Sequence, residues 1–123
     1  MRSGEDAERL RAVGDIEAAC RRIAAARKVA IEWIVLQEMA AAACDAAEQE
    51  RFVAAIRAHD LPVRRLPSGA GHDAMQFARM TPTAMLFVRC GNGGISHSPR
   101  ETLSPEDAEV ATSVLLRYLE DLR

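Results

Sequence analysis

The sequence is poor in cysteine. It has three, Cys20, Cys44 and Cys90, which are odd in number and widely separated. A disulfide framework has an even number of cysteines, and a structural zinc site needs its ligands a few residues apart. The sequence therefore predicts neither, and we expect free thiols, as in a protein of the reducing cytoplasm.

The chain also lacks a long apolar run and a concentrated basic stretch. Its longest apolar run, residues 39–44, is short and rich in alanine, and its first residues, "MRSGEDAERLR", are too charged for a signal peptide. The net charge is −2, and the arginine pairs Arg21–Arg22 and Arg64–Arg65 are more typical of solvated faces than of a nucleic-acid site. We expect a soluble, single-domain-sized chain without a membrane span, since 49% of its residues are hydrophobic and 28% are charged.

Three segments have the periodicity or the capping residues of helices. Residues 5–26 carry apolar side chains at steps of three and four, and Gly14 among them means that packing must hold this helix. Asp45 can cap a second helix reaching about Ala58, with Phe52, Val53 and Ile56 facing inward. The last helix is predicted to begin at the cap Ser104, and its inner face comprises Ala108, Ala111, Val114 or Leu115, Tyr118 and Leu122.

Three other segments are typical of β-strands. "KVAIEWIVLQ" alternates apolar faces, "LPVRRLPSG" is a short strand that leads into a loop, and residues 83–88 are apolar on both faces, as in a buried parallel strand. The alternating order of helices and strands predicts an α/β layer structure. A sheet of only three strands would leave long unprotected edges, which indicates a piece of something larger.

Two glycine-rich loops follow the predicted strands. The first is "SGAGHDAM", with His72 beside Asp73, and the second is "GNGGISHSPRE", which contains His97. Loops at the ends of strands are where open α/β sheets bind ligands, and an adjacent carboxylate can orient an imidazole. On the residues alone, each histidine also fits an ordinary polar surface position, and the first loop fits a plain turn. A nucleophilic pairing of Cys90 with a histidine is a further alternative.

Taken in order, "SGAGHDA", "PTAMLFV" and "GGISHSPRE" resemble the C-terminal part of metal-dependent amidohydrolases of the hydantoinase/carbamoylase type. That family includes N-carbamoyl-L-amino-acid hydrolase, allantoate amidohydrolase and β-ureidopropionase, relatives of the zinc exopeptidases. The resemblance spans nearly the whole chain and is strongest over residues 68–115. It implies that residues 39–123 are part of a three-layer α/β catalytic domain. Residues 1–38 would be the last helix and strand of an α+β lid domain through which the family forms homodimers.

The resemblance also implies roles for individual residues. His97 corresponds to a ligand of a site for two divalent ions, zinc or manganese, with cobalt or nickel as alternatives. His72 and Gly71 correspond to substrate-binding residues, and Arg2 to an arginine that grips the carboxylate of an N-carbamoyl or ureido substrate. Asp73 and Glu101 correspond to residues that hold the ligands and substrate-binding residues in place without contacting the metal or the substrate themselves.

Most of that site has no counterpart in this sequence. The family's other metal ligands and its glutamate base lie upstream, and the chain has no His-x-Asp motif and only three histidines. We therefore expect a C-terminal segment of an amidohydrolase that is inactive alone. One alternative is a truncated, non-catalytic relative that dimerises through "KVAIEWIVLQ". Another is an unrelated small α/β protein in which the motifs occur by chance.

Overall fold

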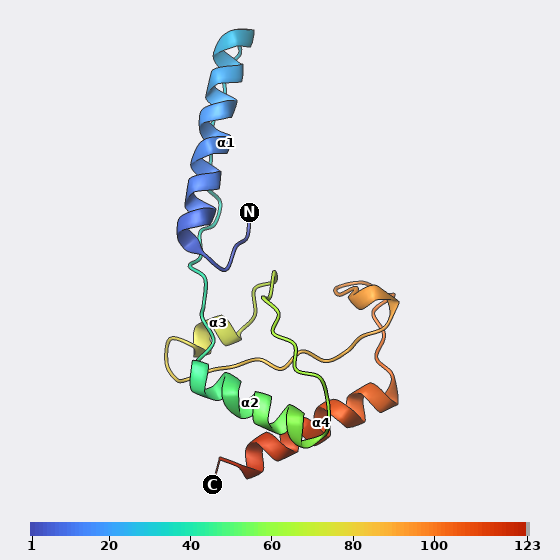
Figure 1. The fold of residues 1–123 in the computed structure, drawn as a ribbon. Coiled ribbons are helices and arrows are strands. Elements are labelled where there is room, and N and C mark those ends of the chain that lie inside the picture. The colour runs from blue at the N-terminus through green and yellow to red at the C-terminus, as the bar shows by residue number, and fades with distance from the viewer. Residues whose placement is uncertain (123) are drawn as a thin grey trace.

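A computed structural model describes residues 1–122 and shows four α-helices and one turn of 3₁₀ helix in this part of the chain (Figure 1). In chain order they are α1 (Asp6–Arg27), α2 (Ala46–Ala58), α3 (Ala74–Phe77), η1 (Asn92–Gly94) and α4 (Pro105–Glu120). The three predicted helices are confirmed, and the short α3 and η1 were not foreseen. None of the described helices is long and apolar enough to cross a bilayer.

Helix α1 and the segment after it form an arm that projects away from the rest of the molecule (Figure 1). Lys28 takes a left-handed conformation, with φ of 54°, and ends the helix, and the chain then runs back along it. The returning segment is tied to the start of α1 at its C-terminal end. There the Ala41 N–H donates to the Asp6 carboxylate at 3.1 Å, and Arg9 donates to Glu38 at 3.5 Å. The packing expected to hold α1 is thin, because Ala24 is its one buried residue.

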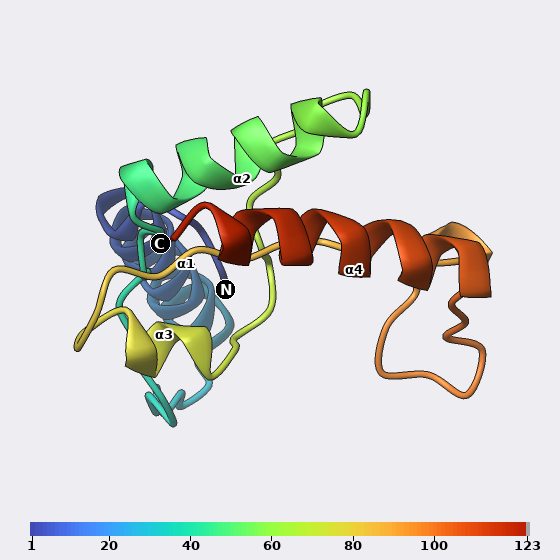
Figure 2. The same ribbon diagram turned by 90° about the horizontal axis from the view of Figure 1, so that it is seen from below.

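The centre of the molecule is the pair of helices α2 and α4, which lie side by side (Figure 2). Both predicted caps are present: Asp45 accepts from the Glu48 N–H at 3.0 Å, and Ser104 accepts from the Asp107 N–H at 3.1 Å. The Phe52 and Tyr118 rings stack with their centroids 4.1 Å apart, and the Tyr118 hydroxyl donates to Glu48. Of the predicted inward residues, Val53 and Val114 are buried, whereas Leu115 and Leu122 are exposed.

Val114 allows a direct test of this helix pair. Its side chain is 2% exposed, and we expect Val114→Ala to lower the free energy of unfolding by about 2 kcal/mol, because it removes buried methyl groups and leaves a cavity. Leu116 on the same helix is 57% exposed, so Leu116→Ala should change the free energy by less than about 0.5 kcal/mol. Urea unfolding followed by circular dichroism measures both, and equal losses would contradict the α2–α4 core.

The prediction of three strands is wrong for residues 1–122, because the structure forms no strand there. Residues 29–35, 61–66 and 83–88 run as uncoiled segments instead. A strand requires a partner for its backbone hydrogen bonds, and no N–H of residues 62–69 or 84–90 donates to any carbonyl in the described chain. The helical elements of the expected α/β fold are therefore present without its sheet, and the three-layer arrangement is not confirmed.

The third uncoiled segment, residues 83–88, is followed by Arg89, which forms an ion pair with Asp107 in the first turn of α4. Arg89 donates to the Asp107 carboxylate at 2.6 Å, and this hydrogen bond is the main cause that lowers the pKa of Asp107. A carboxylate with a lowered folded-state pKa stabilises the fold above its ordinary value near 4, and that stability is lost as the pH falls through the folded-state pKa.

We therefore expect Arg89→Met to return the pKa of Asp107 toward its ordinary value and to weaken the loss of stability in acid. Arg64→Met, which changes another exposed arginine, should leave that pKa where it is. An NMR titration of the Asp107 carboxyl carbon measures both variants. An unchanged Asp107 pKa in Arg89→Met would show that this ion pair is absent in solution.

Candidate functional site

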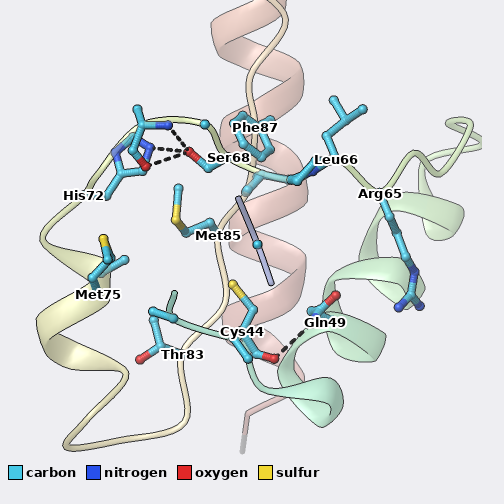
Figure 3. Close-up of a pocket in the computed structure, with 18 of the residues that line it drawn as sticks. Cys44, Gln49, Arg65, Leu66, Ser68, His72, Met75, Thr83, Met85 and Phe87 are labelled. Carbon is cyan, nitrogen blue, oxygen red and sulfur yellow. Dashed lines mark hydrogen bonds between the residues drawn. The ribbon is translucent and has the colours of Figure 1, made fainter. Parts of the chain in front are cut away.

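A hollow with a volume of about 1240 Å³ lies against α2 and α4. Residues 61–72 border it on one side and residues 83–89 on another, and residues 37–44 and the first four residues also line it. Figure 3 shows side chains from these segments, among them Leu66, Met85 and Phe87, around the space. Two of the segments that the sequence predicted to be strands thus form part of the wall of this hollow.

The loop "SGAGH" forms one rim of this hollow. The Ser68 hydroxyl lies 2.9 Å from Nε2 of His72, and Figure 3 shows the two side chains turned toward each other. The Arg2 guanidinium donates to the Gly69 carbonyl at 2.8 Å, across 67 positions of sequence. Gly71 also lines the hollow, and a Cβ added there would make only ordinary van der Waals contact with the Met75 sulfur, at 3.7 Å. The structure thus brings together Arg2, Gly71 and His72.

Arg2 and His72 together form a rim suited to a small anion with a carbonyl group. A guanidinium carries five N–H donors in a planar fork, and the Gly69 carbonyl occupies one of its nitrogens. The Ser68 hydroxyl holds Nε2 of His72 and leaves Nδ1 for another partner. Both side chains are exposed, so a bound molecule could reach them from the hollow.

The second loop, which contains His97, is organised by its own side chains. His97 has a φ of 54°, an uncommon conformation for a residue with a side chain, and its N–H donates to Glu101 at 3.0 Å. The Asn92 amide donates to the Arg100 carbonyl at 2.6 Å and so ties the start of the loop to its end. Glu101 thus supports the backbone at His97, and the imidazole remains exposed.

The two loops do not meet. Arg2 and His72 line the hollow, but His97 does not, and the loop with η1 (orange) lies away from α3 and the loop before it in both views (Figures 1 and 2). Within residues 1–122 no three His, Cys, Asp or Glu side chains gather closely enough to hold a metal ion. The described residues therefore do not fit a two-ion centre on their own, and His97 offers a single imidazole to one.

Two polar residues of these loops were missed from the sequence. Ser68 contacts His72 from four positions earlier, while the expected neighbour, Asp73, makes no side-chain hydrogen bond to His72 among the described residues. Asn92 closes the second loop. Asn tolerates positive φ, and its place within "GNGG" was a usable signal for such a turn. The supporting role of Asp73 stays a prediction.

The sequence model of peptidase family M20/M25/M40 matches residues 4–121 of the chain. A probable allantoate deiminase of Oryza sativa is 42% identical over an alignment of 103 residues that covers 73% of this chain and 21% of that relative. An N-carbamoyl-L-amino acid amidohydrolase of Geobacillus stearothermophilus is 40% identical over 93 residues, which are 76% of this chain and 22% of that relative. An allantoate deiminase of Arabidopsis thaliana is 52% identical over 61 residues, half of this chain and 11% of that relative. The chain thus spans about a fifth or less of these relatives, and no solved structure matches it significantly.

Proposed function

Because the chain belongs to peptidase family M20/M25/M40, we propose that it forms part of a metal-dependent amidohydrolase that cleaves C–N bonds of N-carbamoyl or ureido amino acids. The observation that carries this proposal is the joint position of Arg2, Gly71 and His72 at one rim of the hollow. The names of the relatives support the substrate class, since they act on allantoate or on N-carbamoyl-L-amino acids.

The chemistry of this rim fits such a substrate. A ureido acid carries a carboxylate at one end and a ureido carbonyl at the other. A guanidinium can donate to both oxygens of a carboxylate at once, which gives orientation as well as affinity. When the Ser68 hydroxyl donates to Nε2 of His72, Nδ1 carries the ring proton and can donate to the carbonyl.

We propose that His97 contributes one ligand to a divalent-metal centre, with zinc or manganese as the ion and cobalt or nickel as alternatives. The remaining ligands must come from segments outside residues 1–123, because the described residues hold no cluster that could bind an ion. Such an ion would supply Lewis-acid activation of water. Glu101 keeps the His97 backbone in its left-handed conformation and so fixes where the imidazole begins.

The arm and the rest of the chain suit different parts of such an enzyme. We propose that residues 1–38 belong to a lid or dimerisation domain and residues 39–123 to a catalytic domain. Figure 1 shows α1 and its return segment projecting away from the α2–α4 pair, and this supports the division. Residues 29–36 expose several apolar side chains, namely Val29, Ile31, Ile34, Val35 and Leu36.

That exposed segment favours a second candidate function, a non-catalytic module that dimerises through residues 29–36. An apolar, unpaired segment is a ready partner for a second copy. This alternative requires the isolated chain to be a stable dimer in the absence of metal. Light scattering coupled to gel filtration, repeated with a metal chelator, distinguishes it from a monomer that needs further segments.

The proposed function is tested with two proteins. The isolated chain should not turn over N-carbamoyl-L-amino acids or allantoate with added zinc, manganese or cobalt. A chimera, in which residues 1–123 replace the matching stretch of the Geobacillus stearothermophilus amidohydrolase, should release ammonia from N-carbamoyl-L-amino acids when metal is present. Turnover by the isolated chain would contradict the expectation that its site is incomplete. A folded but inactive chimera would contradict the proposed function itself.

A further inference from the structure

The loop of residues 91–102, which carries His97, has no core to pack against. Figures 1 and 2 show this loop (orange) standing clear of α1, α2 and α3. None of its residues is buried, and all but Ile95 and Ser98 are exposed. A segment without buried apolar contacts opens easily unless hydrogen bonds hold it. The position of His97 therefore depends on the hydrogen bonds within the loop.

Two local turns make up most of this loop. In the first, the Gly94 N–H donates to the Gly91 carbonyl at 3.0 Å. In the second, the Glu101 N–H donates to the Ser98 carbonyl at 2.9 Å, directly after His97. Each of these bonds spans three residues, so neither fixes where one turn lies relative to the other.

Asn92 connects the two turns. Its side-chain amide donates to the Arg100 carbonyl at 2.6 Å and to the Thr102 hydroxyl at 3.3 Å. The other side-chain hydrogen bonds within the loop span four residues or fewer. Gly91 permits this approach, because a Cβ at that position would clash with the Thr102 hydroxyl. The two bonds of Asn92 thus form a brace across the loop, next to the backbone bond from the Gly91 N–H to the Thr102 carbonyl at 2.9 Å.

Position 92 requires two properties that asparagine combines. Its φ is 51°, in the left-handed region that asparagine, aspartate and glycine adopt more readily than other residues. The brace also needs a short side chain that can donate a hydrogen bond. An ionised aspartate only accepts hydrogen bonds, and glycine has no side chain. Asn92→Asp and Asn92→Gly therefore keep the backbone preference and remove the brace.

We propose that Asn92 is a positioning residue for His97. The brace sets the second turn against the first, so the imidazole is presented in one place before other segments complete the site. This inference rests on the proposed function, in which His97 supplies one metal ligand. A ligand that is already fixed loses less conformational entropy on binding than a mobile one. Loss of the brace should therefore weaken metal binding although His97 itself is still present.

Hydrogen exchange read by mass spectrometry tests the brace in the isolated chain and in the metal-free chimera. In Asn92→Gly and Asn92→Asp, the amides of residues 93–101 should exchange about tenfold faster than in the parent, because the loop opens more often. The amides of α2 and α4 report whether the fold is intact. Arg100→Gln is the matched control and should exchange at the parent rate, since the brace uses the carbonyl of Arg100 and not its side chain. Parent-like exchange in both Asn92 variants would overturn the proposal.

Zinc affinity of the chimera, measured by competition with a chromogenic chelator, tests the effect on His97. Both Asn92 variants should bind zinc about 10- to 100-fold more weakly, the usual cost of losing a residue that orients a ligand. At saturating zinc, kcat should stay within about threefold of the parent, because the ligand is still present. Glycine adds flexibility and aspartate adds charge, so a shared loss of affinity is due to the missing amide. Parent-like zinc affinity in both variants would show that the brace does not position His97.

These results are separable from the test of the proposed function. Hydrogen exchange and zinc affinity require no turnover. A chimera that binds zinc without releasing ammonia, and binds it more weakly in both Asn92 variants, would support the role of Asn92 and reject the amidohydrolase activity. Turnover by a chimera whose zinc affinity is the same in both variants would support the activity and reject the role of Asn92.

Discussion

Replacing His97 with alanine in the chimera is expected to reduce kcat/KM for an N-carbamoyl-L-amino acid by more than about 100-fold. Loss of a residue that merely supports a metal ligand costs about 10–100-fold, so loss of the ligand itself should exceed that range. The variant should fold normally, because the His97 side chain is exposed and the loop is tied by Asn92 and Glu101. Steady-state ammonia release over a series of metal concentrations measures the effect.

The control for this variant is His59→Ala, which removes an exposed histidine at the end of α2. Its kcat/KM should stay within about twofold of the parent, because surface substitutions of this kind have small effects. If His97→Ala and His59→Ala behave alike, His97 is an ordinary surface residue, as its sequence position alone also allowed. We expect a large loss of kcat/KM in His97→Ala alone, and we expect excess metal to restore part of it.

The second large effect is expected at His72. His72→Ala in the chimera should lower kcat by about 100- to 1,000-fold, the cost usually found when one hydrogen-bond donor to a reacting carbonyl is removed. Ser68→Ala should cost less, since it leaves the imidazole in place and removes only the hydroxyl that lies 2.9 Å from Nε2. The ratio of the two losses separates direct contact with substrate from a general disturbance of the loop.

Arg2 provides the contrast to His72. A residue that holds a distant carboxylate equally in the ground state and the transition state changes KM more than kcat. Both kcat and KM must therefore be measured for His72→Ala and Ser68→Ala, so that an effect on the carbonyl can be told from an effect on carboxylate binding. A His72→Ala variant whose KM rises while kcat is unchanged would contradict a position of His72 at the carbonyl and would place it at the carboxylate instead.

The helices and their caps could be predicted from the sequence because their determinants are local. Asp45 and Ser104 each bond an N–H three residues ahead, and the apolar spacing of α4 identifies Val114 as buried. The apolar face of α1 was also evident from the sequence, but the spacing of its residues does not show which element packs against it. Leu10, Ile16 and Ile23 are exposed in the structure. Periodicity predicts which side of a helix is apolar, and only the contacts in the folded chain show what packs against that side.

The strands could not be obtained in the same way. "TAMLFV" has the composition of a buried strand, yet a ladder needs a row of backbone partners. Within residues 1–122 only its first residue has one, because the Thr83 carbonyl accepts from the Asp45 N–H at 2.8 Å. The candidate site shows the same limit. The two glycine-rich loops were evident from the sequence, whereas the bond of Arg2 to Gly69 joins residues 67 positions apart and depends on the folded chain. Ser68 was overlooked because serine in such a loop also suits a plain turn.

The most direct test of the account is the metal content of three purified proteins after dialysis, measured by inductively coupled plasma mass spectrometry. The account predicts no tightly held ion in the isolated chain, about two ions per chain in the chimera, as in two-metal hydrolase sites, and fewer in the chimera with His97→Ala. Equal metal content in the chimera with and without His97 would contradict the claim that this chain supplies one ligand to a site completed by other segments.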